Sequence, residues 1–141
     1  MIKTFRGLIE DGGQDTIVLH TNDGSTGYKI VKFQLMPLNF NVTDEYNVKV
    51  WKVSTTGSMT FDFNDNTLLA GGYFENSSAS TDVPATGSII FDNETFNQDI
   101  YVTQNSQSGN ACNYYLELEQ VKLDINESTV ATLKDIRNVK Q

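Results

Sequence analysis

Residues 113–123, with the sequence NYYLELEQVKL, alternate leucine and glutamate at their centre. A repeat of two is typical of an antiparallel strand that buries one face and leaves the other in water. A shorter run of the same kind, Gln98–Thr103, comes before it, and the polar residues 104–110 lie between the two. We therefore predict a β-hairpin, whose apolar face needs a second layer to cover it. A β-sandwich is the fold class that follows.

Most of the remaining chain is also divided into short apolar runs separated by turn residues. Pro37 ends the third run because proline has no amide proton to donate to a neighbouring strand. In that run we expect one face to carry Val31, Phe33 and Leu35. The runs predict strands at Ile2–Ile9, Thr16–His20, Tyr28–Met36, Tyr46–Val53, Met59–Phe63 and Ser88–Phe91.

Two stretches between these strands are less regular. Residues 67–74 fit either one helical turn or an irregular strand, and the polar residues 76–87 predict an exposed loop. No repeat or linker divides the chain. We therefore expect a single all-β domain over residues 1–141, an antiparallel β-sandwich of the jelly-roll kind with about eight strands.

The tail from Asp124 to Gln141 fits two structures. Asp124 and Glu127 have the spacing of a helical capping box, and a stripe at spacing three is formed by Val130, Leu133 and Ile136. The sequence TVATL at residues 129–133 suits a last strand equally well. We favour a strand or extended segment.

The charge and the scarcity of cysteine and histidine exclude several classes of function. The formal net charge of −8 repels a phosphate backbone, so nucleic acid is not an expected partner. Cys112 is the single cysteine and His20 the single histidine, which rules out an intramolecular disulfide and a histidine-based metal site. No apolar run is long enough for a membrane span or a signal peptide, so we expect synthesis and folding in the cytoplasm.

Three groups of residues could carry chemistry, and each has a simpler interpretation. Asp62, Asn64 and Asn66 match the start of a calcium loop, but Thr67 stands where that loop needs glycine. Glu117 and Glu119 share one face of a strand, as solvent-facing alternation alone would arrange. His20 has no nucleophile motif near it in the sequence. We expect no catalytic residues, no cofactor and no metal, and therefore not an enzyme.

The aromatic residues, among them Trp51, Tyr101, Tyr114 and Tyr115, could in part form a sugar-stacking face. Aromatic side chains are also ordinary members of sheet cores and cross-strand pairs, which is the interpretation that we favour.

Six segments of the chain carry a resemblance to a known group of proteins: KTFRGL (3–8), GGQD (12–15), GYKIVKFQ (27–34), FDNETFNQDIYVT (91–103), NYYLELEQ (113–120) and TVATLKDIR (129–137). With these segments the chain resembles, nearly from end to end, small virion structural proteins of tailed phages of aquatic bacteria, cyanophages among them. The resemblance implies a viral context and assigns no site residues.

In that context we expect a virion structural protein, made in the host cytoplasm, that binds other proteins. The favoured version is a capsid decoration or cement protein that bridges major capsid protein subunits, as a homotrimer matched to the threefold positions of a shell. Alternatives are a tail, collar or fibre-attachment component, a carbohydrate-binding module used in host adsorption, and a small hydrolase. The predicted contact residues are Phe5, Arg6, Ile136 and Arg137, because aromatic and guanidinium groups are enriched at interface cores.

Overall fold

The computed structural model describes residues 1–39, 41–76 and 86–137, except for the side chains of residues 86, 125, 128 and 134–137. Within these residues, no helix has the length and apolar character that crossing a membrane would need. The elements in chain order are β1 (Ile2–Ile9), β2 (Gln14–Ile17), β3 (Thr26–Pro37), β4 (Asp44–Trp51), β5 (Leu68–Asn76), β6 (Thr86–Phe91), β7 (Ile100–Ser106), β8 (Cys112–Lys122) and α1 (Ile125–Arg137).

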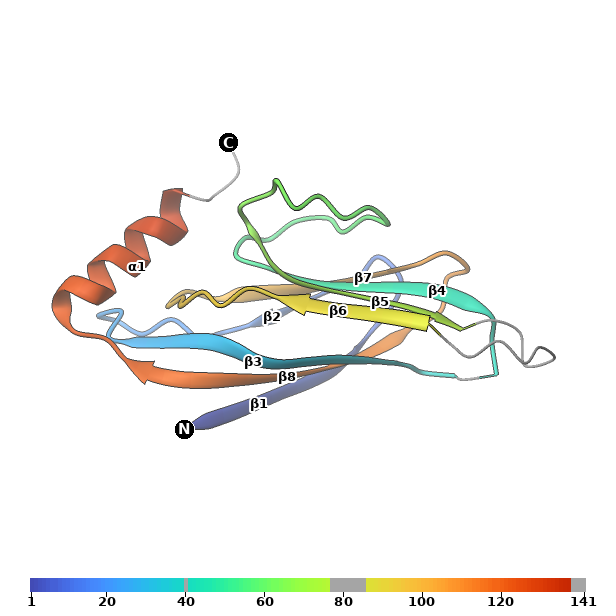
Figure 1. Cartoon of the computed structure of the whole chain (residues 1–141), viewed down its shortest axis with the longest axis horizontal. Helices are drawn as coiled ribbons and strands as arrows, with labels where there is room; N and C mark the ends of the chain where they lie inside the picture. The colour runs from blue at the N-terminus through green and yellow to red at the C-terminus, as the bar shows by residue number, and fades with distance from the viewer. Residues whose placement is uncertain (40, 77–85, 138–141) are drawn as a thin grey trace.

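The strands form two antiparallel sheets that lie one above the other (Figure 1). One sheet has three strands in the order β1-β8-β3, and the other has five in the order β2-β7-β4-β5-β6. Early strands pair with late ones, β1 with β8 and β2 with β7, as in a long hairpin rolled into a jelly roll. β6 pairs with β5 and so extends the five-stranded sheet. The prediction of an all-β, jelly-roll-like sandwich with about eight strands is confirmed by the residues that the structure describes.

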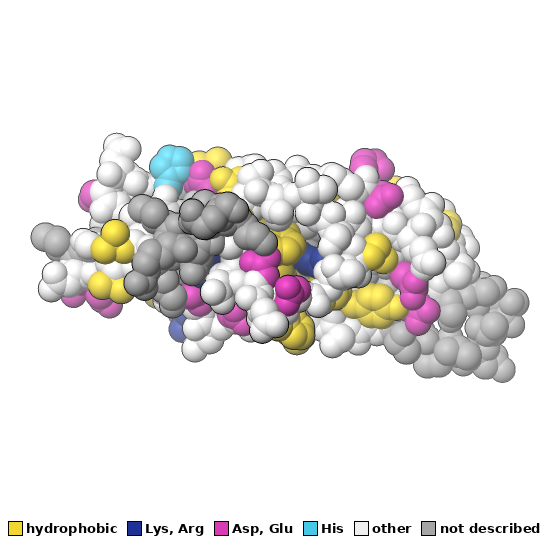
Figure 2. All heavy atoms as spheres, turned by 90° about the horizontal axis from the view of Figure 1, so that it is seen from above, with side chains coloured by type: hydrophobic (Ala, Val, Ile, Leu, Met, Phe, Trp, Pro, Cys, Tyr) yellow, Lys and Arg dark blue, Asp and Glu magenta, His cyan; other side chains and the backbone are white. Residues whose placement is uncertain are grey.

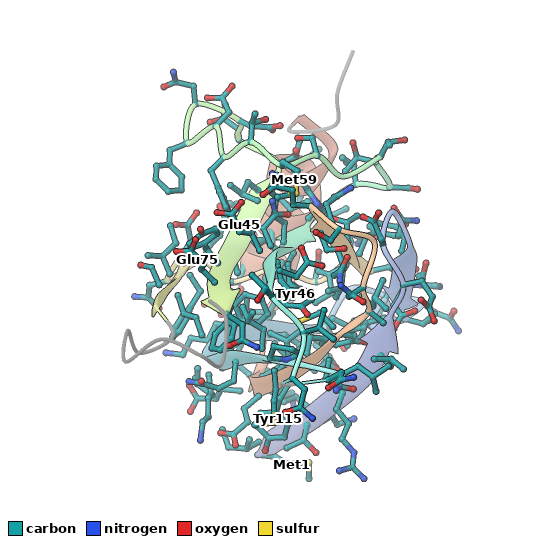
Figure 3. All side chains as sticks on the ribbon, turned by 90° about the vertical axis from the view of Figure 1, so that its right-hand side faces the viewer. Met1, Glu45, Tyr46, Met59, Glu75 and Tyr115 are labelled. Atoms are coloured by element: carbon teal, nitrogen blue, oxygen red, sulfur yellow. The ribbon has the colours of Figure 1, made fainter. Side chains whose placement is uncertain are left out.

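The core lies between the two sheets and is made by the inward-facing side chains of both. From β8 it receives Leu116 and Leu118, which are fully buried, and from β4 it receives Tyr46, which lies between the layers in Figure 3. Complete burial of a leucine stabilises a fold by about 1.5–3 kcal/mol relative to an exposed one. The alternation in residues 113–123 therefore has the expected structural cause.

The predicted hairpin between the last two strands is wrong. β7 pairs with β4 and β2, whereas β8 pairs with β1 and β3, so the chain crosses from one sheet to the other between them. Asp44 at the start of β4 holds this crossing, because its carboxylate accepts hydrogen bonds from the backbone amide of Ser108 at 2.9 Å and from Asn110 Nδ2 at 2.8 Å. Strand spacing in a sequence does not say which sheet each strand joins.

A β-bulge changes the predicted face of β3. The register with β8 shifts between Ile30 and Lys32, which leaves Val31 as an extra residue. Val31 is therefore exposed, while Ile30, Phe33 and Leu35 all point into the core.

Other strand predictions differ from the structure in position or type. β2 ends at Ile17, before the predicted Thr16–His20 run is complete, and residues 59–63 belong to a loop. Residues 67–74 fall almost entirely in β5, so the strand interpretation of that stretch is the right one. The predicted loop at residues 76–87 falls mostly on residues 77–85, which lie outside the described part.

The tail is a helix, contrary to the strand that we favoured. The capping box decides it: the Glu127 amide donates to Asp124 Oδ1 at 2.7 Å, and the Asp124 amide donates to Glu127 Oε1 at 3.1 Å. α1 stands at one end of the sandwich (Figure 1), with Ala131 buried and Val130 and Leu133 exposed.

Candidate functional site

The chain itself covers the centre of the outer face of the five-stranded sheet. Residues 52–67, which connect β4 to β5, lie over it, and the loop is closed where the Lys52 amide donates to the Thr67 carbonyl at 2.8 Å. Figure 3 shows Met59 of this loop above the sheet, and Asn47 Nδ2 lies 3.5 Å from its sulfur. Seen from above in Figure 2, this side of the molecule carries acidic side chains at several places and few basic ones.

Lys49 is enclosed beneath this loop. Its Nζ donates to the carbonyl oxygens of Ser58, at 2.7 Å, and of Thr60, and lies 4.8 Å from the centre of the Phe61 ring. Burial lowers the pKa of the Lys49 ammonium. The Phe61 ring lies against Gly71, where an added Cβ would be 2.5 Å from Cε1 of the ring. Only 1% of Lys49 is exposed, so it fastens the loop and is not open to a substrate.

No described residue of the chain covers the outer face of the three-stranded sheet. This face carries the candidate site. Its side chains stand in cross-strand rows, because partner residues of neighbouring strands point to the same side. One row is Arg6 on β1, Tyr115 on β8 and Gln34 on β3, and the next is Leu8, Asn113 and Met36.

These two rows, together with Lys32, line a shallow cavity of about 830 Å³. We call it the β8 groove and define it by Arg6, Leu8, Lys32, Gln34, Met36 and Tyr115. Figure 3 shows Tyr115 projecting from the lower sheet, away from the core.

The electrostatics of the β8 groove differ from those of the whole molecule. Tyr115 donates its hydroxyl proton to Glu117 Oε2 at 2.7 Å, and this hydrogen bond raises the pKa of Tyr115. Lys32 Nζ lies 5.9 Å from the centre of the Tyr115 ring. In the described part of the chain, neither Arg6 nor Lys32 has a carboxylate within 4.0 Å, whereas the nearby Lys29 pairs with Glu119 at 3.3 Å.

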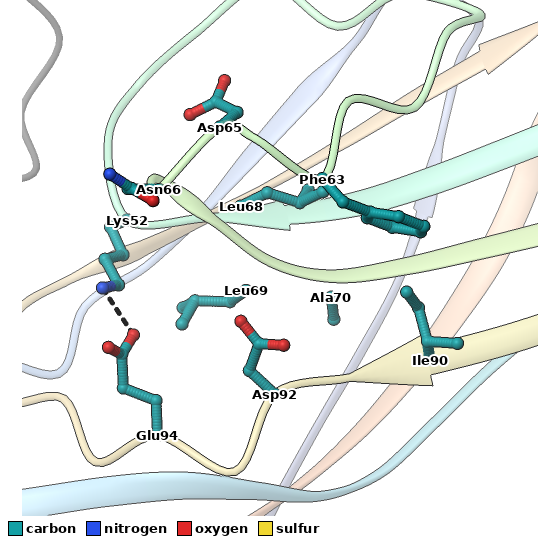
Figure 4. A pocket seen from close by; sticks show the side chains of 10 residues that line it. All are labelled: Lys52, Phe63, Asp65, Asn66, Leu68, Leu69, Ala70, Ile90, Asp92 and Glu94. Carbon is teal, nitrogen blue, oxygen red and sulfur yellow. Dashed lines mark ion pairs between the residues drawn. The ribbon is translucent and has the colours of Figure 1, made fainter.

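A second cavity, of about 390 Å³, lies at the edge of the other sheet (Figure 4). Lys52 Nζ and Glu94 Oε2 form an ion pair of 2.5 Å in its wall, with the Lys52 side chain almost completely buried. Asp65 Oδ1 accepts hydrogen bonds from the amide and the hydroxyl of Thr67. Asp92 also lines the cavity.

These acids form no recognisable metal centre. Among the described residues, no three histidine, cysteine, aspartate or glutamate side chains are grouped to hold a metal ion. Asp62 of the suspected calcium loop makes a turn instead, in which its Oδ1 accepts a hydrogen bond from the Asn64 amide at 2.9 Å.

The four predicted contact residues belong to two elements, β1 and α1. Phe5 and Arg6 are neighbours on β1 and point to opposite faces: Phe5 packs against the core, and Arg6 lines the β8 groove. Ile136 and Arg137 lie in the last turn of α1, and their side chains fall outside the described residues.

The other residues considered for chemistry have structural partners. His20 Nδ1 lies 2.7 Å from Asp99 Oδ1, and the same oxygen accepts hydrogen bonds from the backbone amides of Leu19 and His20. Glu117 accepts a hydrogen bond from the Tyr115 hydroxyl, and Glu119 forms an ion pair with Lys29. Burial raises the pKa of the Cys112 thiol to about 12, so it is a poor nucleophile.

Of the residues that line the groove, the sequence analysis predicts only Arg6 as a contact residue. The sequence presents Tyr115 only as one of many aromatic residues, and Lys32, Gln34 and Met36 carry no signal of their own. Comparison of the chain with protein-family models and with curated proteins finds no match.

Proposed function

We propose that this protein is a structural component of a phage virion, and that its main role is to decorate and stabilise the capsid through contacts with major capsid protein. The sequence resemblance gives the viral context. The observation that carries the proposal is the bare outer face of the three-stranded sheet, where Arg6, Tyr115 and Met36 stand together. Arginine, tyrosine and methionine are enriched in the cores of protein interfaces.

A cement role needs a rigid domain that stays soluble until it reaches the shell. The net charge of −8 opposes non-specific aggregation in solution. The loop over Lys49 covers the centre of the five-stranded sheet, whereas the described residues leave the outer face of the three-stranded sheet open to a partner. Binding at symmetric positions on a shell is compatible with a trimer, whose closed symmetry fits a local threefold axis.

Quantitative mass spectrometry of purified particles tests this proposal. Hundreds of copies per particle would support a place on the shell, and about a dozen would move the protein to the tail or collar. Its absence from the particles would overturn a structural role. Heating shells with and without added protein is the functional control, because a cement protein should raise the temperature at which shells come apart.

A carbohydrate-binding role is the second candidate, and the composition of the β8 groove favours it. The groove combines the Tyr115 ring with the side-chain amides of Gln34 and Asn113, groups that can contact a sugar ring and its hydroxyls. Lys32 over the tyrosine ring counts against stacking of a neutral sugar on that side of the ring. Glycan-array binding that is lost in Tyr115→Ala and kept in Tyr101→Ala would favour this role.

A further inference from the structure

We infer that the β8 groove receives an acidic, extended segment of a protein partner, with carboxylates of that segment paired to Arg6 and Lys32. This inference rests on the proposed function in one respect, that the partner is a protein. It adds the surface and the chemistry of the contact.

The charge of the groove is the first argument. The chain as a whole is strongly acidic, yet Arg6 and Lys32 are the charged residues that line the groove. Glu117, the cross-strand partner of Lys32, accepts the Tyr115 hydroxyl at 2.7 Å and forms no ion pair with Lys32 within 4.0 Å. Two cations with no carboxylate within 4.0 Å in the described part of the chain form a local field that attracts an anionic ligand.

The apolar part of the groove is the second argument. Leu8 is 45% exposed and Met36 is 57% exposed, and they stand in one row across the sheet with Asn113 between them. A ligand that satisfied the charges alone would leave this row in water. A polypeptide can satisfy both, since an extended segment alternates its side chains and can place acidic and apolar groups in turn.

The position of the cations favours a peptide over a charged sugar. Arg6 and Lys32 lie on the two outer strands of the sheet, on either side of Tyr115 on the central strand. Arginine binds carboxylates through two parallel hydrogen bonds. Lys32 Nζ lies over the Tyr115 ring, 5.9 Å from its centre. This face of the ring is therefore better suited to a carboxylate that pairs with Lys32 than to stacking with a pyranose.

The test uses the isotopically labelled whole chain and two anionic probes. One probe is a short poly-L-glutamate peptide, and the other is polygalacturonate, which carries its carboxylates on sugar rings. Amide chemical shifts in nuclear magnetic resonance spectra report which residues each probe contacts, and titration gives its affinity.

The decisive variant is Arg6→Glu/Lys32→Glu, which reverses both groove charges. The matched control is Lys3→Glu/Lys122→Glu, which changes the net charge equally at two exposed lysines that do not line the groove. Thermal unfolding of both variants checks that they remain folded.

We expect poly-L-glutamate to shift the amides of the β8 groove, and the groove variant to weaken its binding about tenfold or more, with little effect of the control variant. The inference is overturned if the probe shifts no groove residue, if both variants weaken binding equally, or if polygalacturonate binds more tightly than the peptide. Particle mass spectrometry tests the virion role independently. If the protein is abundant on particles and the groove variant still binds shells, the inferred contact is wrong and the proposed virion role stands.

Discussion

β4 is the central strand of the five-stranded sheet, and β8 is the central strand of the three-stranded sheet. β4 is buried on both of its faces, whereas β8 is buried on one. Nearly every residue of β4 is buried, because the core covers one side and the loop at residues 52–67 covers the other. In β8, buried residues alternate with half-buried ones. The sequence of β4 also alternates, with Tyr46, Val48 and Val50 toward the core and Asn47 and Lys49 on the other face, but there the loop covers the polar face. The same alternation is therefore open to a partner in β8 and closed in β4, and only the structure distinguishes the two.

The largest expected effect separates two leucines on opposite sides of the three-stranded sheet. Leu116→Ala should lower the free energy of unfolding by about 2–5 kcal/mol, because it leaves a cavity in the core. Leu8→Ala, on the open face, should change it by about 0.5 kcal/mol or less. Urea denaturation of both variants measures the difference. Equal losses of unfolding free energy would mean that the outer face of the three-stranded sheet is covered as well, contrary to the contrast between β4 and β8.

A pair of lysines gives the next largest contrast. Lys49→Met should cost about 1–3 kcal/mol of unfolding free energy, because the carbonyls of Ser58 and Thr60 lose their donor under the loop. Lys32→Met, on the open face, should have little effect on stability. A Lys49→Met protein as stable as the wild type would show that the loop is held by Phe61 and its neighbours without the ammonium.

The crossing between the sheets should depend on pH through Asp44. Burial alone would raise the pKa of this carboxyl, but hydrogen bonds from Asn110, from the Ser108 amide and from the Glu45 amide outweigh burial and lower it. A carboxyl with a lowered folded-state pKa contributes stability that is present above its unfolded value, near 3.8, and is lost as the pH falls below it.

Asp44→Asn should therefore lower the unfolding free energy at pH 7 by about 1 kcal/mol and flatten its decline in acid. Denaturation curves at several pH values down to about 2.5 would show whether the variant and the wild type converge in acid, as this explanation requires. Parallel curves at all pH values would contradict it.

The smallest expected effect concerns the cap of α1. Asp124→Ala should cost the helix about 1 kcal/mol, because the Glu127 amide loses its acceptor. Hydrogen exchange should then quicken in α1 and stay unchanged in β8. Faster exchange in both would mean that the helix and the sheets unfold as one unit.

These contrasts also explain what could be predicted from the sequence. β1 and β8 were placed almost at their observed ends, because each has a clear apolar pattern bounded by turn residues. Residues 59–63 look like a strand because Met59, Phe61 and Phe63 alternate with polar residues. In the structure Phe61 covers Lys49, whereas Phe63 is exposed. Apolar residues at alternate positions can thus belong to a loop that seals a sheet.

The candidate site was beyond sequence reasoning for a different reason. Arg6, Lys32 and Tyr115 come from three strands that are far apart in the chain, and only the register of β1 and β3 against β8 makes them neighbours. The bulge after Ile30 sets the phase of the second half of β3, including Gln34 and Met36. Pairing partners and bulges depend on tertiary packing, which one sequence does not reveal. For the tail, the sequence fits both a helix and a strand, and the capping box of Asp124 and Glu127 is the signal that favours the observed helix.

The place of β8 in the chain has a consequence for how the protein folds. β1 and β3 both pair with β8, which comes last among the strands, so neither has its partner in the three-stranded sheet until Lys122 has been synthesised. Contacts of such long sequence separation make folding slow, and unpaired strands of a growing chain are prone to aggregate. The three-stranded sheet that carries the β8 groove should therefore form late, and a chain shortened before residue 122 should accumulate as insoluble protein.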